Sequence, residues 1–423
     1  MKHASPSRLA LALAVLLFTF SSPVFAQFTI NVLHNFRSVQ NDGSGPEVAP
    51  VMDSAGNLYG ITSLFGANAE GMAYELSPSS SGWTYTIIYQ FTQSTASAAW
   101  PNGGLILDAQ GNLYGVSQFG GANNKGTVYE LSPGSSGWTQ TVLYSFAGGS
   151  DGESGNGSLI FDSAGNLYGT TNKGGANGSG TVFELSPSAS GWTEQVLYTF
   201  TGGADGANPG GNLLIDSAGR IYGMAIQGGT VVSGACIFGC GTIFRLTNTG
   251  GTWRFARLFN FQGITGGSAP VTIAFDSAGN IYGSASAGGS GCGTSGIGCG
   301  TIFKLTPPAS AGPWREKVLH AFNSQQGASP TGVAFDSKGN LYGTCFEGAP
   351  QNEGNVWQLS PTTSGPWTFT TLFAFGKASD GYLSNSGVIV DATDNLYGTT
   401  TNGGANGGGT VFELSPAASE KRE

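Results

Sequence analysis

The residues of this chain best suited to chemistry are carboxylates and aromatic side chains in loops between predicted strands. Asp151, Asp205 and Asp380 each precede a glycine in such a loop, and Trp100 and Tyr382 lie in loops of the same kind. An aromatic ring can stack on a sugar ring while carboxylates accept hydrogen bonds from the sugar hydroxyls. The alternative interpretation is structural, because Asp-Gly favours a turn and Trp100 can cover a gap in a long loop. We treat these five residues as candidate ligand-binding residues.

Residue types for enzymatic catalysis are scarce. The histidines are His3, His34 and His320. We find no Ser-His-Asp set and no His-based metal cluster, and the Gly-Gly-Ala-Asn loops join strands, so they lack the helix N-terminus that binds phosphate. We therefore expect no catalytic residues, no cofactor and no metal. A carboxylate-only enzyme stays open as an alternative, since glycosidic cleavage needs just two acidic groups at a suitable separation.

A ten-residue motif that recurs seven times organises the chain. Its clearest copy is DSAGNLYGTT at residues 162–171, and successive copies begin 54 to 60 residues apart, a period typical of repeat architectures. The leading aspartates are Asp53, Asp108, Asp162, Asp216, Asp276, Asp336 and Asp391. Asp at the first position of the motif favours a tight turn between two strands. The fourth position is Gly in six copies and Asp394 in the seventh, and both residue types tolerate left-handed backbone.

Calcium binding is the alternative role for these aspartates. An oxygen-ligand site needs about six to eight donors around one ion, whereas the motif contributes one aspartate per repeat. We therefore interpret the seven aspartates as turn caps.

Each repeat contains four predicted strands, named a to d in chain order. Strand a ends at the motif aspartate and strand b is Asn-Leu-Tyr-Gly. Strand c resembles GTVFEL at 180–185 and strand d resembles WTEQVLYTF at 192–200. These runs are rich in β-branched and aromatic residues and are bounded by Gly, Ser and Pro. No stretch beyond the first 26 residues shows a convincing helical period.

The repeats begin and end out of phase. Residues 28–36 match strand d without a preceding a, b or c, and residues 409–414 match strand c without a following d. If these two segments pair, each strand type occurs seven times and the last blade closes a ring, which hides the strand edges. The sequence therefore predicts an all-β fold, a seven-bladed β-propeller with four antiparallel strands per blade, in one domain from residue 27 to 416.

The two faces of such a propeller differ in sequence. With strand a lining the channel, the a–b and c–d turns lie on one face and the d–a and b–c loops lie on the other. The first face carries near-identical turns, and the second carries variable loops. Binding residues concentrate on loops held by a rigid scaffold. We therefore place the candidate site on the face of the variable loops.

The five cysteines suggest an oxidising environment. Cys236 and Cys240 lie in one b–c loop, and Cys292 and Cys299 lie in the next. We predict the disulfides Cys236–Cys240 and Cys292–Cys299. A zinc site of four thiolates is the alternative, but the spacing across two blades fits it poorly. Cys345 remains as a half-buried thiol in strand b.

The two ends of the chain and its charge bear on location and partners. Residues 1–26 resemble a signal peptide, with Lys2 and Arg8 before an apolar core and a cleavage site near Ala26. Residues 417–423 form a polar tail. The formal net charge of −9 argues against nucleic acid and anionic membranes as partners. We expect a secreted monomer, extracellular or periplasmic, without membrane insertion.

The combination of DSAGNLYGTT, GTVFELSP, a following Trp and VLYxF resembles the tandem GloVer (Gloeo/Verruco) repeat of exported bacterial proteins, often grouped as choice-of-anchor proteins. The resemblance covers nearly all of residues 28–416. It implies a propeller-like protein of the bacterial exterior, and it supplies no established activity and no catalytic residues. Members often carry a C-terminal sorting segment, whereas this chain ends in Ala-Ser-Glu-Lys-Arg-Glu.

We therefore expect a secreted, non-catalytic binding or scaffold module whose partner is a carbohydrate or a cell-surface protein. The alternatives are a carboxylate-dependent polysaccharide hydrolase or lyase on the variable-loop face, and a purely structural surface protein.

Overall fold

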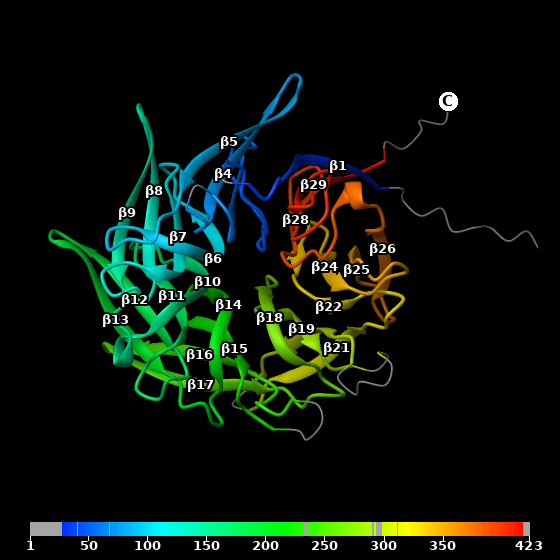
Figure 1. Cartoon of the computed structure of the whole chain (residues 1–423). Helices are drawn as coiled ribbons and strands as arrows, with labels where there is room; N and C mark the ends of the chain where they lie inside the picture. The colour runs from blue at the N-terminus through cyan, green and yellow to red at the C-terminus, as the bar shows by residue number, and fades with distance from the viewer. Residues whose placement is uncertain are drawn as a thin grey trace, which may run out of the picture.

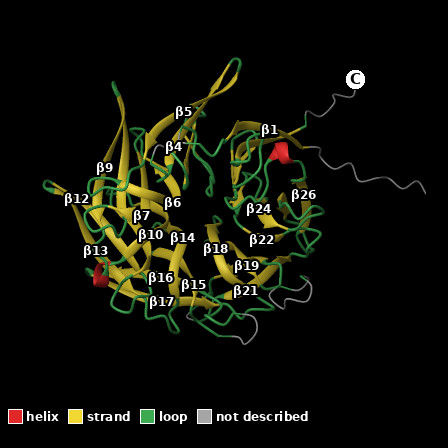
Figure 2. Cartoon of the chain, viewed as in Figure 1, coloured by secondary structure: helices red, strands yellow, loops and turns green. Residues whose placement is uncertain are grey.

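The computed structural model describes residues 28–417 except 40, 67, 232–235, 290, 291, 293–297 and 311. The expected signal peptide and nearly all of the polar tail lie outside the described residues. The described chain consists of strands and loops, with short 3-10 turns at η1 (Gly149–Asp151) and η3 (Ala378–Asp380) (Figure 2). No helix within this part of the chain is long and apolar enough to cross a bilayer. The prediction of an all-β fold is confirmed.

The strands form antiparallel units that each contain one copy of the motif. Unit 1 comprises β2 (Val51–Met52), β3 (Leu58–Thr62), β4 (Met72–Ser79) and β5 (Gly82–Gln90). Unit 2 comprises β6 (Ala98–Leu107), β7 (Leu113–Gly120), β8 (Thr127–Gly134) and β9 (Gly137–Ser145). Unit 3 comprises β10 (Glu153–Phe161), β11 (Leu167–Lys173), β12 (Thr181–Ser188) and β13 (Gly191–Thr199). Unit 4 comprises β14 (Ala207–Ile215), β15 (Ile221–Gln227), β16 (Thr242–Thr249) and β17 (Thr252–Asn260).

The remaining units complete a ring (Figure 1). Unit 5 comprises β18 (Ser268–Phe275), β19 (Ile281–Ala287), β20 (Thr301–Thr306) and β21 (Arg315–Ala321). Unit 6 comprises β22 (Ala328–Pro330), β23 (Ala334–Phe335), β24 (Leu341–Glu347), β25 (Asn355–Ser360) and β26 (Thr368–Ala374). Unit 7 comprises β27 (Val388–Val390), β28 (Leu396–Thr400), β29 (Thr410–Pro416) and β1 (Phe28–Asn35).

The N-terminal and C-terminal strands close the ring. Strand β1 pairs antiparallel with β29, from Phe28 opposite Pro416 to Asn35 opposite Thr410. Figure 1 shows the two strands side by side, one from each end of the described chain. The predicted pairing of residues 28–36 with residues 409–414 is therefore confirmed.

The number of separate sheets differs from the prediction of seven separate blades. Five sheets contain one unit each, and a sixth, eight-stranded sheet contains units 3 and 4. The link is a parallel pair between Ser158 of β10 and Asn212 of β14. Gly157, with φ of +83°, lies so close to Gly211 that a side chain at 157 would overlap its carbonyl oxygen. This close approach lets two inner strands of neighbouring units hydrogen-bond to each other.

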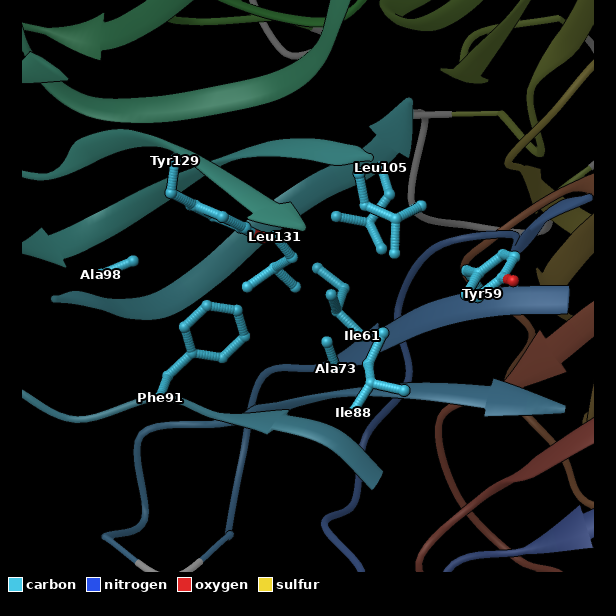
Figure 3. Packing of buried hydrophobic residues seen from close by; sticks show 10 residues of the cluster. Tyr59, Ile61, Ala73, Ile88, Phe91, Ala98, Leu105, Tyr129 and Leu131 are labelled. Atoms are coloured by element: carbon cyan, nitrogen blue, oxygen red, sulfur yellow. The ribbon is translucent and has the colours of Figure 1, made fainter. Parts of the chain in front are cut away.

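The hydrophobic core lies between successive units. Figure 3 shows one cluster, in which Ile61 and Ile88 of unit 1 pack near Leu105 and Leu131 of unit 2. Equivalent clusters lie at every junction around the ring, including that of unit 7 with unit 1. Burial of each such side chain stabilises the fold by about 1.5–3 kcal/mol. Packing between units therefore holds the ring together.

Burial along the strands follows their place in the ring. In unit 3, the second strand β11 is buried at five consecutive positions, because units on both sides cover its faces. The outer strand β13 alternates between exposed and half-buried positions, as expected for a strand at the rim.

Candidate functional site

The motif aspartates cap the turns that follow strand a. In unit 3, Asp162 Oδ1 accepts the backbone N–H groups of Ala164 (2.8 Å) and Asn166 (2.9 Å). Its Oδ2 accepts hydrogen bonds from Asn166 Nδ2 (2.8 Å) and the Tyr168 hydroxyl (3.1 Å). Burial raises the pKa of Asp162, but these hydrogen bonds outweigh burial and leave it lowered. The carboxylate is therefore fully used by the turn.

Two of the predicted ligand residues cap the loops between units. Asp151 accepts hydrogen bonds from the Tyr144 hydroxyl (2.8 Å) and the Ala147 N–H (2.5 Å). Asp205 likewise accepts from the Tyr198 hydroxyl (2.9 Å) and the Thr201 N–H (2.8 Å). Each carboxylate thus ties the outer strand to its own d–a loop.

Trp100 occupies a position that recurs around the ring. Its backbone is left-handed, with φ of +52°, and its N–H donates to the Glu70 carbonyl of the preceding unit (3.0 Å). The same left-handed backbone and inter-unit hydrogen bond occur at Gly45, Ser154, Asn208, Ala269, Ser329 and Leu383. The Trp100 ring is 39% exposed and packs edge-on against Phe119 at 5.6 Å. Its backbone has a structural role, while its ring faces solvent.

Asp380 and Tyr382 lie together in the d–a loop of unit 7. Asp380 Oδ1 accepts a hydrogen bond from Ser379 Oγ (3.0 Å). Tyr382 is partly buried and packs against the core between units 6 and 7. Among the described residues, no hydrogen bond, ion pair or ring contact joins any two of the five predicted ligand side chains. Their role in binding remains a prediction.

The predicted disulfides are confirmed. Cys236 is bonded to Cys240 and Cys292 is bonded to Cys299, each with Cα atoms 5.1 Å apart. Cys345 is the free cysteine and is fully buried, rather than half-buried as predicted. It lies in β24, whose side chains are covered by neighbouring units, and burial raises the pKa of its thiol.

A large cleft lies on the face of the a–b and c–d turns, opposite the variable loops. It has a volume of about 1200 Å³ and lies between units 4 and 5. We name it the arginine cleft after three of its lining residues. These residues are Arg220, Arg245 and Arg257. The cleft is bounded by β17, by the turns at Asp216 and Asp276, and by the loop at residues 307–314.

Prolines in unit 5 open this cleft. In unit 4 the hairpin between strands c and d is tight, since β16 ends at Thr249 and β17 begins at Thr252. Figure 1 shows such hairpins of units 1 to 3 as long fingers that project from the ring. In unit 5 the strands stop at Thr306 and restart at Arg315, because Pro308 and Pro313, which replace non-proline residues of the hairpins in units 1 to 4, cannot donate hydrogen bonds to a ladder. The shortened hairpin leaves space beside β17.

The arginine cleft is where the repeat breaks its own pattern. Arg220 takes the motif position that is asparagine in the other copies, namely Asn57, Asn112, Asn166, Asn280, Asn340 and Asn395. Arg245 takes the strand c position held elsewhere by Glu75, Glu130, Glu184, Lys304, Gln358 and Glu413. Three of the six arginines that the structure describes line this one cleft. A protein of net charge −9 thus concentrates positive charge here.

The guanidinium groups of the cleft have different partners. Arg220 Nε lies 2.5 Å from Asp216 Oδ2. Arg245 Nε is buried and has no hydrogen-bond partner. Burial raises the pKa of Asp216, but hydrogen bonds from Arg220, Tyr222 and Ala218 outweigh burial and lower it. Arg220 and Arg245 therefore place cationic groups beside a carboxylate that stays ionised, and Arg245 also hydrogen-bonds to Tyr222.

Aromatic side chains form one wall of the cleft. The rings of Tyr222 and Trp314 meet edge-on at 6.4 Å, and Phe275 lies 5.0 Å from Tyr222. Planar guanidinium groups match carboxylate and sulfate groups through paired hydrogen bonds. Guanidinium groups beside aromatic rings suit a ligand that is both anionic and partly apolar, as an acidic sugar is. This site was not among the predicted binding residues, although the substitutions at Arg220 and Arg245 are visible in the repeat.

Comparison with solved structures supports the ring architecture. A candidate 6-phosphogluconolactonase from Bacteroides uniformis is 14% identical, with 81% of this chain and 88% of that chain covered and a TM-score of 0.52. The extracellular domain of a one-component system from B. thetaiotaomicron is 14% identical, with 90% and 41% covered and a TM-score of 0.53. At this identity the likeness concerns the fold alone. No curated protein matches the chain.

A family model assigns the chain. The model described as the Gloeobacter/Verrucomicrobia repeat matches residues 16–238 and 231–422. These two segments include all seven copies of the motif, as the resemblance predicted. The chain belongs to the Gloeobacter/Verrucomicrobia repeat family.

Proposed function

We propose that this protein is an exported, non-catalytic binding module that holds an acidic glycan in the arginine cleft. The observation that carries the proposal is the change from the repeat's usual residues to Arg220 and Arg245 at one cleft. Asparagine serves the fold at the Arg220 position in all six other copies, so the turn itself does not require an arginine there. Export accords with the two disulfides, which form in oxidising compartments.

We also propose that the ring is a seven-bladed propeller, with units 3 and 4 as separate blades. Their inner strands share a single parallel residue pair, whereas the strands within each unit pair along most of their length. A hydrophobic cluster lies between them as it does at the other junctions.

Acidic sugars fit the cleft better than neutral ones. A carboxylate or sulfate group can pair with the guanidinium groups that line the cleft and neutralise part of the local positive charge. A sugar ring can pack against Trp314. Oligosaccharides of uronic acids present both features in every residue.

Carboxylate-dependent hydrolysis finds little support at this site. The acidic residues of the cleft are Asp216 and Asp276. Glycoside hydrolysis needs one carboxylic acid that is protonated near neutral pH. Burial raises the pKa of both aspartates, but hydrogen bonds to the turn and, for Asp276, the charge of Lys304 outweigh it, so both pKa values are lowered. Both side chains therefore lack the proton that this chemistry requires.

The test is calorimetric titration of the full chain with trigalacturonate and with its neutral methyl ester, each at low and moderate salt. The Arg220→Asn/Arg245→Glu variant restores the residues that other units carry, so we expect it to fold normally. We expect trigalacturonate to bind, and this variant to lose about 10- to 100-fold in affinity. The surface variant Arg315→Glu, outside the cleft, serves as control.

Two results would contradict the proposal. Equal affinity for the acid and its methyl ester would remove the role of charge. Absence of binding to trigalacturonate and to a sulfated oligosaccharide alike would favour a purely structural protein.

A further inference from the structure

Exposed apolar side chains gather on the face of the d–a and b–c loops. The described chain exposes nine large hydrophobic side chains, and all nine lie in these loops or at the strand ends beside them. They are Val39, Leu64, Phe65, Trp100, Phe119, Val231, Ile237, Phe238 and Ile264. Exposed apolar surface that is confined to one face of a protein indicates a contact surface.

The four most exposed of these side chains lie in one part of the face, which we name the apolar sector. It consists of three loops of units 4 and 5, at residues 228–241, 261–267 and 288–300. Its exposed side chains are Val231 (64%), Ile237 (67%), Phe238 (71%) and Ile264 (51%). The sequence of the three loops contains no Asp, Glu, Lys or Arg. The apolar sector is therefore an uncharged surface on a protein of net charge −9.

The three loops adjoin one another. The Thr230 N–H in the first loop donates to Asn260 Oδ1 (3.0 Å), at the residue before the second loop. In the third loop, a side chain at Gly288 would overlap the Gly263 carbonyl oxygen of the second. The exposed side chains therefore belong to one region of the surface.

The segment that carries Ile237 and Phe238 is fixed by its own contacts. The Cys236–Cys240 disulfide closes it. The Phe238 carbonyl accepts a hydrogen bond from the Gly228 N–H (2.8 Å). Because this segment is ordered before any contact is made, binding through Phe238 costs little further conformational entropy.

A groove of about 230 Å³ lies beside Phe238. Ile226, Ala269 and Ala287 line it together with Phe238 itself. The apolar sector thus has a projecting aromatic ring next to an apolar groove. A surface with both features can pack against a second copy of itself, because a two-fold axis brings the ring of each copy to the groove of the other.

Charge favours a second copy as the occupant. Two copies of net charge −9 repel each other over most of their surface. In a two-fold contact the same surface patch is present on both sides, so a charged group near the axis would meet a like charge. The uncharged apolar sector avoids this cost. An anionic membrane would repel the chain as a whole.

The exposed area suits a weak dimer. The four side chains of the apolar sector together expose on the order of 500 Å². Two copies would bury on the order of 1,000 Å², which is near the lower limit for a specific interface. Such an interface supports a reversible dimer rather than a permanent one.

We propose that, instead of the monomer expected from its sequence, the protein forms a weak two-fold dimer through the apolar sector. Phe238 of each copy enters the groove of the other. The arginine cleft opens on the opposite face of the ring, so the dimer leaves both clefts free. Dimer formation therefore does not depend on the proposed function.

The test is sedimentation velocity of the full chain over a series of protein concentrations at low and high salt. We expect a monomer–dimer equilibrium in the micromolar range that higher salt strengthens, because salt screens the repulsion between the copies. Phe238→Glu should weaken the dimer by about tenfold or more, because it places like charges opposite each other. Val39→Glu changes another exposed side chain (47%) of the same face outside the apolar sector, and this control should dimerise like the wild type.

A mixture of two variants tests the two-fold geometry. Phe238→Glu and Phe238→Lys should each stay largely monomeric, whereas their equimolar mixture should dimerise because opposite charges then meet across the interface. Misfolded variants could not restore the dimer in this way. A mixture that stays monomeric would overturn the proposed geometry.

Other outcomes separate the alternatives. A monomer at every concentration, or a dimer that survives Phe238→Glu, would overturn the proposal. Phe238-dependent binding of a monomeric chain to phosphatidylcholine vesicles would assign the apolar sector to a lipid surface and would also overturn it. Phe238→Glu should bind trigalacturonate like the wild type, and Arg220→Asn/Arg245→Glu should dimerise like the wild type, so either proposal can fail without the other.

Discussion

Glu194 should make this protein less stable as the pH rises toward neutrality. Its side chain lies at the junction of units 2 and 3 on β13, and its Oε1 is buried without a hydrogen-bond partner. Burial, followed by the negative charge of Asp151, raises the pKa of Glu194 to about 7 from the usual 4.5. Between these values the folded protein keeps a proton that the unfolded chain has released. The free energy of unfolding therefore falls as pH rises from about 4.5 to about 7.

The structure sets the size of this effect. One pKa unit corresponds to about 1.4 kcal/mol, so the shift sets a ceiling of about 3 kcal/mol. The side chain is partly exposed, and solvent screening reduces the expected effect to about 1–2 kcal/mol. The equivalent position in unit 2 is Gln140, whose Oε1 accepts hydrogen bonds from Tyr89 (3.0 Å) and Ser97 (2.9 Å). The repeat thus already accommodates glutamine at this place.

The assay is thermal unfolding of Glu194→Gln and wild type at pH 5 and pH 8. We expect similar Tm values at pH 5 and a Tm about 2 °C higher for the variant at pH 8. Glu184→Gln makes the same change of charge at a residue that is hydrogen-bonded to Ser186 (3.2 Å), and it should not show this pH dependence. An equal effect of Glu194→Gln at both pH values would show that the raised pKa of Glu194 does not cause the loss of stability.

Two further substitutions test how a junction between units and a loop disulfide contribute to stability. Burial lowers the pKa of His320 to about 4. Below pH 6.5 the unfolded chain therefore binds a proton that the folded protein does not bind. The free energy of unfolding falls as the pH drops from 6.5 toward 4. His320 of unit 5 stacks on Phe369 of unit 6 at 4.3 Å, as Tyr198 of unit 3 stacks on Phe255 of unit 4. His320→Tyr should therefore raise Tm at pH 5 and leave it unchanged at pH 8. A gain at pH 8 alone would contradict this. Loss of the Cys236–Cys240 disulfide should lower the free energy of unfolding by about 2 kcal/mol, because the loop that it closes is short. Denaturant unfolding of the variant with alanine at both positions measures this. A loss above about 5 kcal/mol would contradict this prediction.

The repeat made much of the fold predictable. Asp162 and Gly165 carry turn chemistry in their residue types, and Asp394 adopts the left-handed backbone (φ of +65°) that replaces glycine in the seventh copy. The out-of-phase ends predicted the pairing of β1 with β29. The cysteine positions predicted both disulfides. These features depend on local sequence or on simple counting of strands.

The site was harder to predict because it depends on contacts between units. The arginine cleft exists where β17 of unit 4 meets a hairpin of unit 5 that Pro308 and Pro313 have shortened. The variability of the d–a and b–c loops led us to predict a site on the opposite face. There, Asp151 and Asp205 accept hydrogen bonds that fix their own loops. The joined sheet of units 3 and 4 depends on backbone proximity at Gly157. A position-by-position comparison of the seven copies would have found Arg245.

A crystal structure of the full chain with trigalacturonate would show whether the arginine cleft binds an acidic glycan. We expect ligand density between units 4 and 5, with a carboxylate group within hydrogen-bonding distance of Arg245 and a sugar ring on Trp314. Density on the variable-loop face beside Trp100 or Tyr382, with an empty arginine cleft, would contradict the account.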